Sequence, residues 1–246
     1  MQLLGILFAS QMALFTVAAD WQIVGNIGGV ETYTKPDDPV TRTKAVRGTR
    51  LFANLHISNV LGVFKDVAVA TQWVDMLSAM HEYDFVPRQC NAEEEEASAF
   101  VKKHTSSSST SAPPSSDVQV VHQTYSFPWP IAPRDFLFLR EFSFDEKKAE
   151  VNVYYESVLD DRVPVKDGVI RARNVYTVFR FKAVEAGTEV QVETAVDLKG
   201  TLPSVVINQI QKLWPMKTLL ALERLSKKVG SSSALARVAA WKPASP

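Results

Sequence analysis

The longest helical pattern in the sequence lies near its end, over residues 204–229, after a region that otherwise has the pattern of short strands. Ser204 after Pro203 predicts the start of this helix, and Gly230 predicts its end. Apolar residues recur at three- and four-residue steps down one side: Val206, Ile207, Ile210, Leu213, Trp214, Leu220 and Leu225. A helix with one apolar side needs a surface to cover, so we expect it to lie across a curved sheet.

The strands of this sheet are clearest between residues 118 and 196, where apolar residues alternate with polar ones. Short connections between them favour antiparallel pairing. The apolar faces are expected to carry Phe136, Phe138, Phe142 and Phe144; Val151, Val153 and Tyr155; Val175, Thr177, Phe179 and Phe181; and Val190, Val192, Thr194 and Val196. The predicted fold is therefore α+β, a curved antiparallel sheet closed by the C-terminal helix around either a packed core or a cavity.

We place the domain at residues 20–229, with one insertion inside it and one further segment at each end. Residues 1–19 carry no charge and fit a signal peptide, a membrane anchor or an N-terminal helix. Residues 91–117 are rich in glutamate and serine, a composition that predicts a disordered insertion. Residues 230–246 form a C-terminal tail.

The location of the protein in the cell stays open at this stage. The single cysteine, Cys90, and the lack of an Asn-x-Ser/Thr acceptor favour a cytoplasmic or membrane-surface protein over a secreted one. If residues 1–19 are a signal sequence, the protein is instead secreted or anchored through them.

Composition and motifs argue against several classes of function. The net charge is zero, so no domain-wide basic excess exists to neutralise phosphates, and we expect no nucleic-acid partner. The sequence has no Ser/His/Asp order, glycine-rich phosphate loop or metal-ligand spacing. We therefore expect no catalytic residues, no cofactor and no metal site.

Three side chains suggest binding instead. Arg140 falls in the same phase as the phenylalanines of its strand, so it either lies on an exposed face or lines a ligand pocket of roughly several hundred cubic ångströms. His122 on the preceding strand could contact a ligand or be a hydrogen-bonded core residue. Trp129, between two prolines, could meet a membrane or anchor its own loop.

Several motifs in this chain resemble the START domain, the steroidogenic acute regulatory protein-related lipid-transfer family. The likeness lies in residues 128–140, in the strand start at 169–172, and in residues 197–203 followed by 206–208. Trp21 with residues 29–33, and the region of Trp73, are similar to the opening of the family and to its second helix. The resemblance implies a helix-grip fold, with about nine strands around a tunnel for one lipid.

The resemblance also implies the function and the site. We expect a non-catalytic, monomeric protein that binds one sterol or phospholipid and transfers it through transient contact with membrane surfaces. The expected cavity residues are Arg140, His122, Phe138, Tyr155 and Phe179. The expected gate residues are Trp129, Gly200, Leu202, Val206, Ile210 and Leu213.

Two details of the family pattern concern charged residues. Arg134 and Asp135 match its Arg-Asp pair, which we expect to be structural. The acidic partner that sterol-binding members place near the cavity arginine has no clear match here. Two alternatives to lipid transfer stay open: a helix-grip enzyme of the polyketide cyclase or hydrolase type with His122 or a cavity carboxylate as acid or base, and an interaction module with a filled cavity.

Overall fold

The computed structural model describes residues 21–36, 43–85, 117–229 and 235–243. The strands are β1 (Gln22–Ile27), β2 (Val30–Thr34), β3 (Ala45–Ala53), β4 (Leu77–Asp84), β5 (Val118–Tyr125), β6 (Arg134–Asp145), β7 (Glu150–Ser157), β8 (Ile170–Arg171), β9 (Arg173–Val184) and β10 (Gly187–Asp197). The helices are α1 (Ile57–Lys65) and α3 (Ser204–Val229), with the short 3-10 helices η1 (Val67–Gln72) and η4 (Ala236–Val238). The predicted N-terminal segment and nearly all of the predicted insertion lie outside the described residues.

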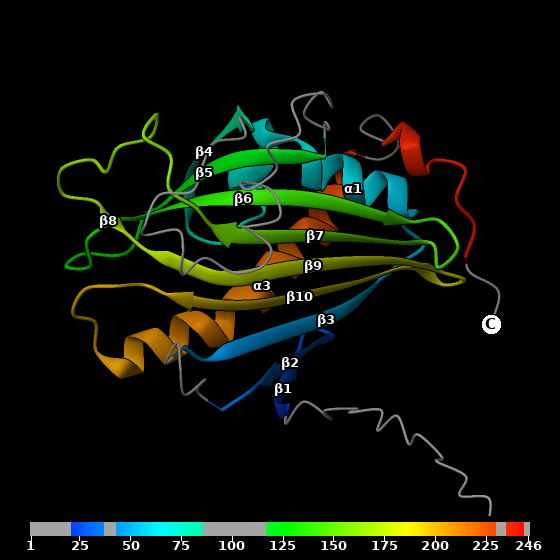
Figure 1. The fold of residues 1–246 in the computed structure, drawn as a ribbon. Coiled ribbons are helices and arrows are strands. Elements are labelled where there is room, and N and C mark those ends of the chain that lie inside the picture. Colours follow the sequence, from blue (N-terminus) through cyan, green and yellow to red (C-terminus); the bar gives the residue numbers. More distant parts are fainter. Residues whose placement is uncertain (1–20, 37–42, 86–116, 230–234, 244–246) are drawn as a thin grey trace, which may run out of the picture.

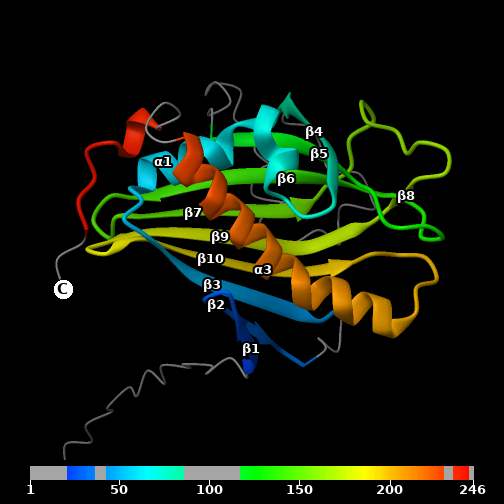
Figure 2. The same ribbon diagram turned by 180° about the vertical axis from the view of Figure 1, so that it is seen from behind.

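Ten strands form one sheet in the order β1-β2-β3-β10-β9-β7-β6-β5-β4, with β8 added beside β6. Every neighbouring pair along the main path is antiparallel, and β8 pairs with β6 in parallel. The sheet is curved, and α3 lies diagonally across its concave face beside α1 and η1 (Figures 1 and 2). The predicted helix-grip architecture is confirmed.

The helix α3 packs closely on the sheet because β3 carries a glycine beneath it. A Cβ atom at Gly48 would lie 2.9 Å from the Cβ of Pro215, inside the closest normal approach. Further along α3, the Glu223 carboxylate contacts Arg50 Nε of β3 at 2.5 Å and Lys227 Nζ at 2.7 Å. Burial alone would raise the pKa of Glu223, but these two cations outweigh burial and lower it. Packing at the middle of α3 and charge nearer its C-terminal end thus fix this helix to β3.

A second, smaller apolar cluster covers part of the outer face of the sheet. Its buried members are Val118, Val120, Leu137, Leu139 and Val163. Val163 lies in the loop between β7 and β8, which folds back over β5 and β6. Both faces of β6 are therefore buried along most of its length, so apolar alternation alone does not reveal which face meets α3.

The chain continues after α3 and packs against the start of α1. The Leu235 backbone N–H donates to the Ser58 carbonyl oxygen at 3.0 Å, and Arg237 Nη1 contacts Asp117 Oδ2 at 2.7 Å. His56 is the N-cap of α1: its Nδ1 accepts from the Ser58 N–H at 3.2 Å, and its Nε2 lies 3.0 Å from the Trp241 carbonyl oxygen. The described part of the predicted C-terminal tail is therefore integral to the domain.

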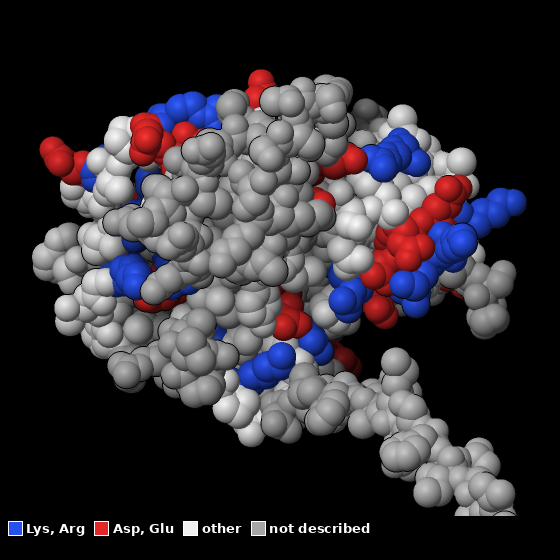
Figure 3. All heavy atoms as spheres, in the orientation of Figure 1, with Lys and Arg blue, Asp and Glu red and all other residues white. Residues whose placement is uncertain are grey.

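Acidic and basic side chains are interspersed over the visible part of the outer face (Figure 3). The exposed Arg180 of β9, for example, faces Glu150 of β7 at 3.4 Å between Nε and Oε1. Such mixing produces no large field of one sign over the described residues that Figure 3 displays.

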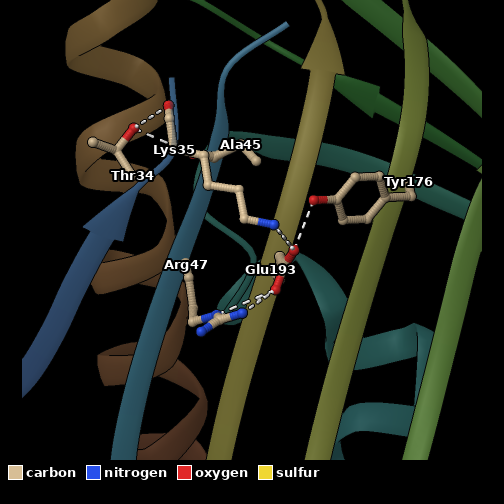
Figure 4. A network of polar contacts seen from close by, with 6 residues as sticks. All are labelled: Thr34, Lys35, Ala45, Arg47, Tyr176 and Glu193. Atoms are coloured by element: carbon tan, nitrogen blue, oxygen red, sulfur yellow. Dashed lines mark hydrogen bonds and ion pairs between the residues drawn. The ribbon is translucent and has the colours of Figure 1, made fainter. Parts of the chain in front are cut away.

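Glu193 of β10 is the centre of a polar network on this outer face (Figure 4). Its carboxylate accepts hydrogen bonds from Arg47 Nε at 3.2 Å, from Arg47 Nη2 at 2.7 Å and from the Tyr176 hydroxyl at 2.7 Å. Lys35 Nζ lies 3.9 Å away. Burial and the bond to Glu193 both raise the pKa of Tyr176, which keeps this phenol a neutral donor. The network ties β10 to β3, β9 and the end of β2.

We predict that Glu193→Gln lowers the free energy of unfolding by about 1 kcal/mol, because a neutral amide cannot replace a charge-assisted acceptor of several donors. The control is Glu189→Gln, an exposed position on the same face of β10, which should change stability by less than about 0.5 kcal/mol. Urea unfolding of both variants measures the difference. Equal effects would show that the network adds nothing to stability.

Candidate binding cavity

A cavity of about 80 Å³ lies between the concave face of the sheet and the N-terminal half of α3. Most of its wall is aromatic or aliphatic: Trp73, Tyr125, Phe127, Phe136, Phe138, Tyr155, Phe179 and Trp214, with Val46, Val74, Met76, Val196, Leu198 and Ile210. Its polar lining residues are Lys44, Gln123, Asn174, Thr177 and Thr194. Such a wall, mainly apolar with a few polar groups, is typical of sites for hydrophobic small molecules. The volume is well below the several hundred cubic ångströms predicted from the sequence.

An outer groove of about 260 Å³ adjoins this cavity. It is lined by Asp75, Met76, Phe127, Pro128, Ile131, Ile210, Leu213 and Lys217. Three of these residues, Met76, Phe127 and Ile210, also line the cavity, so their side chains form the partition between the two spaces. They come from the segment before β4, from the loop between β5 and β6, and from α3.

Three of the five predicted cavity residues line the cavity: Phe138, Tyr155 and Phe179. They belong to three adjacent strands, β6, β7 and β9, and their rings contact one another with centroids 5.6 Å and 6.3 Å apart. Burial raises the pKa of Tyr155, and the nearby Arg140 opposes that rise. Tyr155 therefore lines the cavity as a neutral phenol.

Arg140 shares the inward face of β6 but is not among the residues that line the cavity. It is fully buried, and its Nη2 contacts Glu82 Oε1 of β4 at 2.5 Å and the side-chain oxygen of Gln119 of β5. Its guanidinium also lies 5.0 Å from the Phe142 ring centroid. The prediction placed Arg140 in the cavity wall. In the structure Arg140 lies on the predicted face of the sheet but beside the wall and not in it. The acidic partner for which the sequence offered no match is Glu82, two strands away.

His122 does not reach the cavity, because its side chain lies on the outer face of β5. Its Nε2 lies 2.8 Å from Asp135 Oδ2, and Arg171 Nε and Nη2 both contact the same carboxylate at 2.9 Å. Burial alone would raise the pKa of Asp135, but the hydrogen bonds from Arg171 and His122 lower it below the ordinary value. The expected cavity role of His122 is corrected: it belongs to an outer cluster that fixes β8 against β5 and β6.

Five of the six predicted gate residues are fully described by the structure, and two of these five line the outer groove. Ile210 and Leu213 line the groove, and Leu202 packs half-buried against the core. Trp129, in the loop between β5 and β6, is 92% exposed. Gly200 has a φ of +71°, and a side chain there would meet Ile170, so this position suits glycine. The side chain of Val206 lies outside the described residues.

Arg134 joins the bases of the two predicted gate segments. Its Nε and Nη2 donate to the carbonyl oxygens of Leu198 and Lys199 at 3.3 Å each, and its Nη1 donates to the Ala132 carbonyl oxygen. Leu198 and Lys199 lead into α3, and Ala132 lies near the end of the loop before β6. Burial lowers the pKa of this guanidinium, which is 2% exposed. Arg134 and Asp135 thus face opposite sides of the sheet, and each makes structural contacts.

Several lining residues were not anticipated from the sequence. Asn174 reaches the cavity because β9 bulges: Ala195 and Val196 of β10 oppose Tyr176 and Asn174, which leaves Val175 as the extra residue. Asn174 is 1% exposed, whereas Val175, predicted on the inward face, is half-buried. A bulge shifts the phase of a strand by one residue and leaves little trace in apolar alternation.

Neither a metal site nor a membrane span is found in the described ranges. No group of three or more His, Cys, Asp or Glu side chains there could hold a metal ion. In the same part of the chain, no helix is both long and apolar enough to cross a membrane.

Comparison with known proteins identifies the family of this chain. The START domain profile matches residues 20–219, and the protein belongs to this family. No curated protein sequence matches it. Human StAR-related lipid transfer protein 5 superposes with a TM-score of 0.68 at 15% identity, covering 86% of this chain and 88% of that one.

Two further structures share the fold. A STAR-related lipid transfer protein fragment from Xanthomonas axonopodis has a TM-score of 0.63 at 18% identity, covering 84% of this chain and 98% of its own. Human STARD10 has a TM-score of 0.65 at 15% identity, covering 85% of this chain and 73% of its own. The family match supports lipid binding and transfer at the level of the family, which is generally non-enzymatic.

We predict that Glu82→Ala destabilises the protein by roughly 2 kcal/mol, because it leaves the buried Arg140 cation without its carboxylate. Adding Arg140→Met should recover most of this loss, since an apolar side chain then replaces the uncompensated charge. Thermal and urea unfolding of both variants test this. A double variant less stable than Glu82→Ala alone would show that the uncompensated charge is not the cause.

Proposed function

We propose that this protein holds one lipid between its sheet and α3 and exchanges it at membrane surfaces. The observation that carries the proposal is the apolar, aromatic cavity that adjoins an outer groove and is separated from it by Met76, Phe127 and Ile210. The names of the similar lipid transfer proteins support the same function.

Uptake of a lipid requires the cavity to expand, because sites for drug-sized ligands span about 300–1,000 Å³. The strands are joined by hydrogen-bond ladders, and α3 is held on the sheet at its middle by the Gly48–Pro215 contact and further along by Glu223. The N-terminal half of α3 and the loop between β5 and β6 are the remaining parts of the cavity wall, and these two parts can separate from each other. Displacing Phe127 and Ile210 would join the groove to the cavity without breaking a strand pair.

The enzymatic alternative loses its candidate acid or base. His122 lies on the outer face of the sheet in contact with Asp135, away from the cavity. Among the residues that line the cavity, the ionisable side chains are Lys44, Tyr125 and Tyr155. Burial raises the pKa of each of these tyrosines, so neither is suited to act as a base near neutral pH. We infer a binding function without catalysis.

Lipid binding is tested by extracting the purified full-length protein and analysing the extract by mass spectrometry. We expect about one lipid per chain, and at least roughly tenfold less in Val196→Phe, which places a larger side chain in the cavity wall. The control is Val178→Phe, a half-buried position on the outer face of the neighbouring strand. Absence of lipid from the wild type, together with failure to take up lipid from vesicles, would refute the proposal.

Contact with membranes is tested through Trp129. An exposed indole beside the groove is suited to the membrane interface. We therefore expect Trp129→Ala to slow lipid transfer between vesicles by about fivefold or more while leaving the amount of bound lipid unchanged. Val165→Ala, which alters a 55% exposed residue in the loop between β7 and β8, is the control. Equal transfer rates for all three proteins would place the membrane contact elsewhere.

A further inference from the structure

Three buried polar side chains lie together in the cavity wall: Asn174, Thr177 and Thr194. We call them the polar ledge. They are 1%, 8% and 6% exposed, and all three line the cavity. Thr177 and Thr194 are direct cross-strand partners on β9 and β10, and the bulge at Val175 brings Asn174 onto their face.

The hydrogen bonds of the polar ledge run in one direction. Asn174 Nδ2 donates to the Tyr155 backbone oxygen at 2.9 Å, and because that oxygen can only accept, it fixes the orientation of the amide. The Asn174 side-chain oxygen is therefore an acceptor, and the Thr177 hydroxyl donates to it at 2.8 Å. Thr177 has a single hydroxyl proton. The 2.6 Å contact between the two threonine oxygens thus requires Thr194 to be the donor.

Both hydroxyl protons are therefore used within the polar ledge. The other acceptor near the Thr194 hydroxyl, the Tyr176 carbonyl oxygen, lies 3.5 Å away, too far for a good bond. Thr194 Oγ1 accepts no hydrogen bond from the described residues, although a hydroxyl oxygen has two lone pairs. Thr194 Oγ1 can therefore accept a hydrogen bond from a ligand.

Another side chain in the cavity wall, Trp73, lacks a hydrogen-bond acceptor in the part of the chain that the structure describes. Trp73 lines the cavity, and its indole Nε1 is buried without a hydrogen-bond partner among the described residues. Its ring packs against Phe179, the next inward-facing residue after Thr177 on β9, with centroids 6.2 Å apart. An unpaired buried donor is costly, and a ligand oxygen would satisfy it. A ligand hydroxyl carries the proton that Thr194 Oγ1 can accept, and its oxygen can also accept a hydrogen bond.

We propose that the cavity selects a neutral lipid with a hydroxyl group and that Thr194 Oγ1 accepts the hydrogen bond from that hydroxyl. This inference rests on the lipid-binding function proposed above. Phosphatidylcholine is disfavoured, because its headgroup and ester groups contain acceptors and no hydrogen-bond donor. Of the residues that line the cavity in the described part of the chain, Lys44 alone carries a charge at neutral pH, so a phosphate would lack a cluster of cations.

The test compares lipids whose hydroxyl group is free with the same lipids capped as methyl ethers. The full-length protein is titrated with cholesterol and cholesterol methyl ether, with a diacylglycerol and its methyl ether, and with phosphatidylcholine. We expect each hydroxyl lipid to bind about five- to tenfold more tightly than its ether. Thr194→Val should lower affinity for the hydroxyl lipids to that for the ethers and leave ether binding unchanged. Thr194→Ser should keep the preference.

The control variant is Thr188→Val, a buried threonine of β10 whose hydroxyl donates to the Leu55 carbonyl oxygen at 2.8 Å away from the cavity wall. It should leave the preference for hydroxyl lipids intact. Equal affinity of the wild type for hydroxyl lipids and ethers, or a preference for phosphatidylcholine, would overturn this inference while leaving lipid binding established. Failure to bind any of these lipids would refute the proposed function itself. The wild-type comparison needs no variant, so it stands even if Thr194→Val fails to fold.

Discussion

The arrangement of the molecule follows from covering a large curved sheet with few helices. The inward faces of the strands are apolar, and an apolar face must be removed from water. Towards its C-terminal end α3 achieves this together with α1, and Phe64, Phe181, Leu219 and Leu222 fill the space at 2% exposure or less. Towards its N-terminal end the aromatic wall encloses a small cavity instead. Because a single helix, α3, lies across the curved sheet, it packs tightly on the sheet at one end and leaves a cavity at the other.

Arg134 holds together the two segments proposed to separate during lipid uptake, namely the start of α3 and the loop between β5 and β6. A buried guanidinium usually has a carboxylate partner, but Arg134 donates to backbone carbonyl oxygens on both segments that flank the groove. A carbonyl contact depends on the backbone path rather than on any one side chain. The base of the gate is therefore fixed by hydrogen bonds, while Phe127 and Ile210 pack half-buried against the apolar core. Apolar contact is non-directional and adapts to a changed separation more readily than paired hydrogen bonds.

Much of this could be predicted from the sequence, and the failures have identifiable physical causes. The strands from residue 118 onward, the long final helix and the inward phase of Phe138, Tyr155 and Phe179 follow from two periodicities. His122 was placed on the wrong face because β5 is buried on both sides. Asn174 was missed because a bulge changes the phase within β9. Glu82 became the partner of Arg140 only through the pairing of β4, β5 and β6, which no local pattern encodes.

The return of the chain to α1 after α3 bears on where this domain can be cut. The family match ends at residue 219, inside α3, yet the backbone of Leu235 and Trp241 contacts Ser58 and His56 at the first turn of α1. A recombinant fragment designed from the family boundary would remove the last turns of α3 together with these contacts. It would expose one side of α1 and the ring of Phe144, against which Trp241 and Arg237 pack. Poor solubility of such a fragment would then reflect the choice of boundary and not an intrinsic weakness of the fold.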